Sequence, residues 1–312
     1  MARGWTVAEF AIAMLLSLLV VLCAGGLLLA ATGGYRSNGS AMQMHEAGCH
    51  ALAVLAQSVR QSAYVNWEVA TAPVELDAAA APAIVGLDAR SISRNTDGIS
   101  NPLAAVAQGS DVLAVRFAGS GGAAGDGSVL NCAGFAVRAP ISAEERGWSI
   151  FYVGLNAQRE PELRCKYRGS NGWGADAIVR GVDSFQVLYG LDTDAPPDGV
   201  PNTYANASAI DTLDAGLLLV GGNAAELQRD WNRKTHWKRV CSVKVALLLR
   251  GEAASRPDSV AGQFDVFGSA YAATHGSDEG VRVVESRLPA AQQRRVRQVF
   301  STTILLRNRS GG

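Results

Sequence analysis

Few residues of this 312-residue chain have the types and spacing that catalysis, metal binding or nucleotide binding requires. His45 and His50 are five residues apart, whereas two metal ligands on one helix face stand four apart. The segment Gly119–Ala124 fits G-x-G-x-x-A, but the sequence that follows predicts another strand, so no helix N-terminus would receive a pyrophosphate. Neither a G-x-S-x-G elbow nor a G-x-x-x-x-G-K-[ST] loop occurs. We therefore expect no enzyme and no cofactor; a membrane-tethered periplasmic enzyme or ligand-binding protein is the alternative from another class.

One acidic segment has some features of a calcium loop. Asp192 and Asp194 alternate as calcium ligands do, and Asp198 is followed by a glycine. However, Ala-Pro-Pro separates the third acid from the second, and no glutamate stands at the closing position. We expect a solvated turn and no bound metal, with a calcium site as the alternative.

Composition and charge indicate a folded protein without an affinity for nucleic acid. Hydrophobic residues make up 48% of the chain and charged residues 18%, which is not the composition of a disordered protein. The formal net charge is zero, so the electrostatic signature of a nucleic-acid-binding protein is missing.

An uncharged run of 22 residues, Phe10–Ala31, lies near the N-terminus. A helix of that length spans roughly 33 Å, enough to cross a bilayer. The run is longer than the apolar part of a secretory signal peptide, although residues 30–32 form a weak cleavage site and leave that alternative open. Because Arg3 precedes the run, we expect the N-terminus in the cytoplasm and the rest of the chain outside it.

The helix is expected to continue as an amphipathic second half. No proline interrupts residues 5–72, and glycines at 25–26 and 33–34 are its weakest points. An apolar stripe at alternating steps of three and four would pack against a sheet. With His45 in register, its members are Met42, Cys49, Leu52, Ala56, Val59 and Ala63.

The remainder of the chain predicts a mostly antiparallel β-sheet head, so the fold class is α+β. The regions 70–110, 192–235 and 252–292 are expected to be long loops, because alanine, glycine, aspartate and proline are frequent there. The predicted strands are Asp111–Ala118, Val129–Val137, Ser149–Leu155, Glu162–Tyr167, Gly181–Tyr189, Val240–Arg250 and Val296–Asn308.

Glu9 stands just before the apolar run, where a carboxylate is costly and usually functional. The stretch from Arg3 to Phe10 resembles the class III signal of type IV prepilins, with Trp5 where phenylalanine or methionine is usual. The resemblance implies cleavage between Gly4 and Trp5 by a prepilin peptidase and N-methylation of Trp5. It also implies that Glu9 pairs with the N-terminal ammonium of a neighbouring subunit during assembly, which would give a buried carboxylate its cation.

Several head segments, in order, resemble the PilW minor pilins. The resemblance implies a pilin-like fold with a leader at 1–4, a transmembrane helix at 5–32, the amphipathic half of the first helix at 33–68 and a head at 69–312. The matching segments are Ser110–Phe117, Phe151–Val153, Glu160–Cys165, Ile178–Asp194, Trp237, Val243–Arg250 and Arg294–Arg309.

The family resemblance implies a role in priming type IV pilus assembly near the filament tip, in support of twitching motility and adhesion. It implies other minor pilins, the major pilin, a tip adhesin, the prepilin peptidase and the inner membrane as partners, with the head in the periplasm before assembly. No nucleic acid is expected. The alternative is a minor pseudopilin of a type II secretion system, which shares the leader and the first helix.

Four cysteines follow the apolar run, an even number that suits disulfides in an oxidising compartment. Four cysteines allow three pairings. We predict Cys132–Cys165 within the sheet, because the strand at Phe151–Val153 would bring their strands together. We predict Cys49–Cys241 between the helix and a strand, a pairing that a shift of one residue along the strand would prevent.

Overall fold

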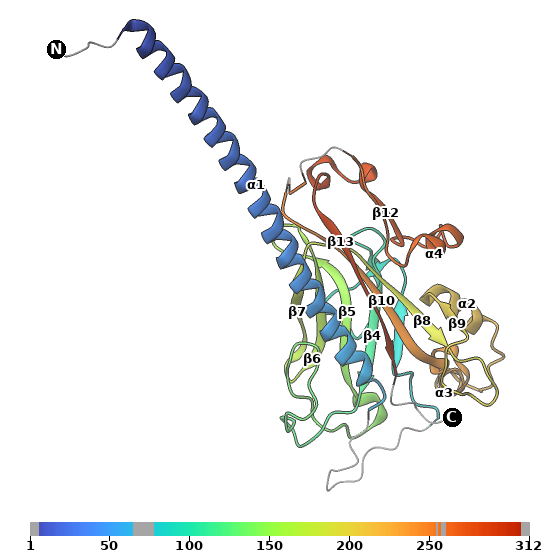
Figure 1. Cartoon of the computed structure of the whole chain (residues 1–312). Helices are drawn as coiled ribbons and strands as arrows, with labels where there is room; N and C mark the ends of the chain where they lie inside the picture. The colour runs from blue at the N-terminus through green and yellow to red at the C-terminus, as the bar shows by residue number, and fades with distance from the viewer. Residues whose placement is uncertain (1–5, 65–77, 254, 257–259, 307–312) are drawn as a thin grey trace.

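The structure, a computed structural model, describes residues 6–64, 78–253, 255–256 and 260–306. A single helix, α1 (Val7–Arg60), projects far beyond a head of antiparallel sheets, and only its second half lies along that head (Figure 1). This arrangement confirms the predicted α+β class. Since residues 65–77 fall outside the described residues, the domain boundary near residue 68 stays a prediction.

The larger sheet has five antiparallel strands in the order β1-β4-β5-β6-β7. Consecutive strands from β4 onward are neighbours, so most of this sheet is a meander. Its strands are β1 (Ile84–Leu87), β4 (Val112–Phe117), β5 (Gly147–Leu155), β6 (Pro161–Gly169) and β7 (Gly172–Arg180).

The second sheet has four antiparallel strands in the order β13-β10-β8-β9. Its centre is β10, whose Val245 is opposite Val187 of β8 on one side and Thr302 of β13 on the other. The strands are β8 (Val182–Leu191), β9 (Thr203–Ala205), β10 (Val240–Arg250) and β13 (Arg297–Leu305).

The second half of α1 packs into a core that both sheets share. Leu55 and Val59 are fully buried there with Leu113 and Val153 of the larger sheet and Val245 of the second. Each such side chain contributes about 1.5–3 kcal/mol when it leaves water. The apolar residues of the sheets' inner faces therefore hold the helix in place.

The helix face that docks matches the later part of the predicted stripe, where Val59 and Ala63 are buried and Leu52 and Ala56 pack on the core, but not its beginning. Met42 and Cys49 are exposed, whereas Met44, Ala51 and Leu55 are buried, so at this end the buried face is rotated relative to the prediction. The reason is Gly48, which is also buried and faces the ring of Phe300 on β13 so closely that a Cβ atom would lie 2.5 Å from it. A close approach of helix and sheet thus falls at a residue without a side chain, which an apolar stripe does not include.

Three regions predicted as loops contain short elements instead. The short elements within residues 252–292 cover the outer face of the second sheet, where Val266 and Val283 pack on Leu248. The strands in these regions are β1 and β9, given above, and β2 (Arg90–Ser91), β3 (Leu103–Ala104), β11 (Gln263–Asp265) and β12 (Arg282–Val284). The helices in them are α2 (Ala207–Ala215), α3 (Ala224–Lys234) and α4 (Ser269–Thr274), with 3-10 turns at Glu285–Arg287 and Ala290–Gln292. Two further 3-10 turns, Ala143–Glu145 and His236–Arg239, lie outside these regions.

The predicted strand Val129–Val137 is wrong. Leu130 and Ala136 form only an isolated bridge around a tight loop. The Asn131 side chain accepts hydrogen bonds from the backbone of Ala133 and Phe135 at 3.0 and 3.1 Å, and this local bonding replaces a sheet ladder. Conversely, β7 was not predicted, because it is an edge strand whose residues, apart from the buried Val179, are exposed or half-buried and show no apolar alternation.

A buried network of charges connects the second sheet to the segment that covers it. Asp183 accepts from Arg250 at 2.9 Å and from Arg297 at 2.6 Å, and Arg297 also reaches Glu285 at 3.0 Å. All four side chains are almost completely buried, so each charge depends on its partners. Hydrogen bonds from Gly262, Arg256 and Arg294 keep the pKa of the Glu285 carboxyl below its ordinary value although burial opposes them.

We predict that Gly48→Ala destabilises the docking of α1, because the new methyl group must displace the Phe300 ring. Overpacking of this kind costs about 1–3 kcal/mol, measurable as a lower midpoint of denaturant unfolding of the full chain in detergent. Gly39→Ala is the matched control, since Gly39 lies in the same helix with nothing within 4 Å of its Cβ position. That control should be neutral or stabilising; equal effects of the two substitutions would contradict the close contact.

Candidate functional site

The N-terminus of α1 carries a capping box made by Thr6 and Glu9. The Glu9 backbone N–H donates to Thr6 Oγ1 at 3.3 Å, while Thr6 N and Oγ1 donate to Glu9 Oε2 at 2.8 and 3.1 Å. The first N–H groups of a helix have no partner within it, so each of these bonds stabilises the helix start. In the single chain, therefore, the Glu9 carboxylate accepts hydrogen bonds from the residue that begins its own helix.

The capping box was missed by the sequence analysis, which singled out Glu9 but not Thr6. The signal was present as T-x-x-E immediately before an apolar run, the pattern by which a capping box is recognised. Gly4 and Trp5, the predicted cleavage and methylation residues, lie outside the described residues.

The first half of α1 is apolar, and every side chain from Val7 to Leu28 is exposed. Within it, Val7–Leu28 is a 22-residue segment long and apolar enough to cross a membrane, and none of it is buried. Phe10, Leu18 and Leu27 are each more than 60% exposed. A continuous apolar surface of this extent needs lipid or other apolar helices around it.

A disulfide joins Cys132, in the loop after Val129, to Cys165 in the middle of β6. The two Cα atoms are 5.8 Å apart and the cysteines are 33 residues apart in sequence. Cys132 N also donates to Ser149 Oγ at 3.0 Å, so the loop is held to β5 as well. Closing a loop of this length stabilises a fold by roughly 3–4 kcal/mol on the chain-entropy model.

The predicted Cys49–Cys241 disulfide is not formed in the structure. The register of β10 against β8 shifts between Val240 and Ser242, and this irregularity places Val240 rather than Cys241 in the core beneath α1. Cys241 Sγ instead points to Gly190 O at 3.5 Å. Cys49 is exposed on the helix with its sulfur 3.7 Å from His45 Nε2.

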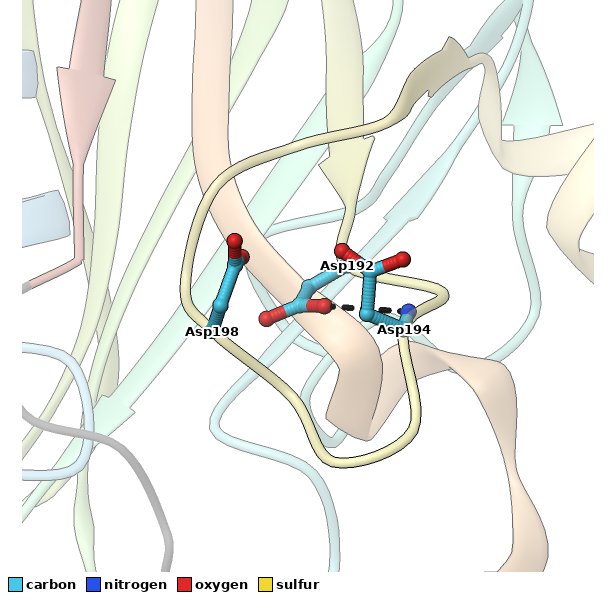
Figure 2. A group of neighbouring side chains, drawn as sticks. All are labelled: Asp192, Asp194 and Asp198. Carbon is cyan, nitrogen blue, oxygen red and sulfur yellow. Dashed lines mark hydrogen bonds between the residues drawn. The ribbon is translucent and has the colours of Figure 1, made fainter.

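The acidic loop brings its three carboxylates together, as Figure 2 shows. One oxygen from each of Asp192, Asp194 and Asp198 lies within 4.8 Å of the others, so the Ala-Pro-Pro insertion does not separate the third acid in space. The carboxylates also accept hydrogen bonds within the loop: Asp192 from Asp194 N at 3.2 Å, and Asp198 from Val200 N at 2.8 Å. This bonding is that of a turn stabilised by its own side chains.

Comparison with known families identifies the family of this chain through its head. The family model described as Type IV Pilus-assembly protein W, PilW, matches residues 150–308, which is 159 of the 312 residues. The chain belongs to the PilW family. No curated protein and no solved structure matches it. As a PilW-family protein it takes part in type IV pilus assembly, and its apolar helix fits a membrane-anchored pilus protein.

The family match does not depend on the features at the N-terminus. Its residues run from within β5 to the end of β13, so they include the whole second sheet and strands β5 to β7 of the larger one, but not β1, β4, α1 or the capping box. The PilW assignment and the free apolar helix are thus separate observations that lead to the same kind of protein.

We predict that calcium leaves the melting temperature of this PilW-family chain unchanged, because the acidic loop already bonds its carboxylates. The test compares the full chain in detergent with EDTA and with about 5 mM calcium, several times the dissociation constant of weak extracellular sites. A site with an affinity of about 0.1 mM would stabilise the protein by about 2 kcal/mol. A clear rise that Asp194→Asn abolishes would contradict the prediction.

Proposed function

We propose that this PilW-family chain is a minor pilin that helps to prime type IV pilus assembly and lies near the filament tip. The role is structural rather than enzymatic. Its partners are other minor pilins, the major pilin and a tip adhesin. Before assembly it is anchored in the inner membrane, with its N-terminus in the cytoplasm and its head in the periplasm. The observation that carries the proposal is the Val7–Leu28 half of α1, none of which the head covers.

The exposed first half of α1 is suited to two environments that the subunit would occupy one after the other. In the membrane its exposed apolar side chains would contact lipid, and in a filament they would contact the same half of neighbouring helices. The second half stays docked by Leu55 and Val59 in both states, so the head moves with its helix as one unit. Nothing in the head has to refold for the subunit to leave the membrane.

An exposed apolar patch on the head supports side-to-side contacts between subunits. Between α2 and α3, Leu218 is 87% and Val220 is 74% exposed. The backbone there is held by α3, since Val220 N donates to Asp230 at 2.8 Å and Lys234 Nζ donates to Leu218 O at 2.7 Å. Ordered apolar side chains presented to solvent are typical of protein–protein contacts.

We also propose that Gly4 and Trp5 flank the cleavage site. Gly4→Leu should leave the leader attached, because a bulky residue before the scissile bond does not fit a peptidase site that accepts glycine. Intact-mass measurement of the membrane-bound protein checks this. The wild-type protein should begin at Trp5 with one added methyl group, and a mature protein that begins anywhere else would rule out the prepilin assignment.

Glu9, we propose, exchanges its bonds to Thr6 for the N-terminal ammonium of a neighbouring subunit. Glu9→Ala should keep membrane insertion, since a charge is removed from the bilayer edge. It should lower the number of surface pili at least tenfold, because losing one partner of a buried pair costs about 3–5 kcal/mol. The measurement is a count of pili in cells that carry only the variant.

Thr6→Ala separates the two roles of this carboxylate. It removes the hydroxyl of the capping box but leaves the Glu9 charge, so it should assemble almost as well as the wild type. Normal piliation with Glu9→Ala would disprove the pairing. An equally severe loss with Thr6→Ala would show that Glu9 acts by capping its own helix.

A further inference from the structure

A cavity lies on the outer face of the larger sheet, away from α1 and the shared core. Its volume is about 520 Å³, within the range of pockets that hold small ligands. Residues of the strands β4 to β7 form its floor, and the segment 97–102 between β2 and β3 forms one wall. Neither the helix nor the predicted assembly residues contribute to it.

Cationic and indole side chains alternate across the floor of this cavity. Arg116 of β4 is opposite Trp148 of β5, and Arg168 of β6 is opposite Trp173 of β7. The guanidinium of Arg116 lies 4.5 Å from the centre of the Trp148 ring, and the two indole rings are 6.1 Å apart, edge to face. Cross-strand neighbours on one face thus present two aromatic surfaces with guanidinium groups beside them.

Polar contacts fix the position of Trp173. Its indole N–H donates to Asp97 at 2.8 Å, and the ammonium of Lys166 lies 4.7 Å from its ring centre. Lys166 is itself completely buried and donates to the carbonyls of Ser93, Thr96 and Gly98 at 2.7 to 2.9 Å. Burial lowers the pKa of the Lys166 ammonium to about 8. The ring and the wall of the cavity are therefore ordered before any ligand arrives, which reduces the entropy lost on binding.

The groups around the two indoles both donate and accept hydrogen bonds. Arg168 is an exposed donor, while Asp97 and Glu144 are exposed acceptors and Ser100 can do either. A sugar ring matches this combination, because its C–H face stacks on the negative face of an indole and its hydroxyls both donate and accept. A nucleic acid does not, since Asp97 and Glu144 would repel phosphates and the chain has no net positive charge.

We propose that this cavity is a saccharide-binding site, with Trp148 and Trp173 stacking on a sugar ring, Arg168 donating to its hydroxyl or carboxylate groups and Asp97 accepting from its hydroxyl groups. The site concerns the head alone and does not depend on the pilus role proposed above. It would give a pilus subunit a direct contact with a glycan.

Calorimetric titration of the full chain tests the proposal. The protein is kept in an amine-oxide detergent, because a detergent with a sugar headgroup would compete. The probes are cellotetraose, chitotetraose and trigalacturonate, which offer neutral, N-acetylated and acidic sugars, and a thymidine octanucleotide. We expect saturable binding of at least one saccharide and none of the oligonucleotide.

Two exposed arginines supply a matched pair of variants. Arg168→Ala, inside the cavity, should lower the affinity for the saccharide about tenfold, a loss of about 1.4 kcal/mol in binding free energy. Arg180→Ala, at the exposed end of β7 and outside the cavity lining, should leave binding unchanged. Trp173→Ala should abolish saturable binding, with an unchanged far-UV circular dichroism spectrum and a cooperative unfolding transition as evidence of a folded head.

Three results would overturn the proposal. One is a titration in which none of the three saccharides gives a saturable heat of binding. Another is equal affinity of the wild type, Arg168→Ala and Trp173→Ala, which would place binding elsewhere. The third is saturable binding of the oligonucleotide alone, which would assign the cavity to a nucleic acid.

Discussion

The docking of α1 on the core shared by the two sheets is the contact on which this structure depends. Leu55 and Val59 are completely removed from water there, and Gly48 lets the helix approach Phe300 of β13. Because the helix continues without a break from Val7 to Arg60, fixing its second half also fixes the direction in which its first half leaves the head (Figure 1). The shape of the subunit follows from one packed interface.

The same continuity leaves the single chain incomplete. The segment Val7–Leu28 exposes apolar side chains that the head does not cover, and their contact with water is unfavourable. This segment is therefore stable in a bilayer or packed among other helices. At the start of that half, Glu9 accepts hydrogen bonds from Thr6, which are weaker than a bond to a cationic partner would be. Both properties agree with the function proposed above, in which the assembled state contains more than one subunit.

Long-period features could be predicted from the sequence, and local irregularities could not. The apolar run and the central strand β10, Val240–Arg250, are continuous patterns, and both are found as predicted. The beginning of the buried helix face was misplaced because Gly48 carries no apolar signal, and the position of Cys241 was wrong because one irregularity in β10 reverses the side-chain alternation. The cavity beside Trp148 and Trp173 is formed by residues of four strands and a loop that is distant in sequence, so no local sequence pattern predicts it.

The central claim, that this chain serves type IV pilus assembly through its helix and head, is tested most directly by deleting its gene. Surface pili are counted by electron microscopy, and type II secretion is measured in the same strain and in the strain with the gene restored. The account predicts that pili are lost or greatly reduced, that secretion is intact, and that restoring the gene restores the pili. Normal piliation together with failed secretion would contradict it and identify a pseudopilin instead.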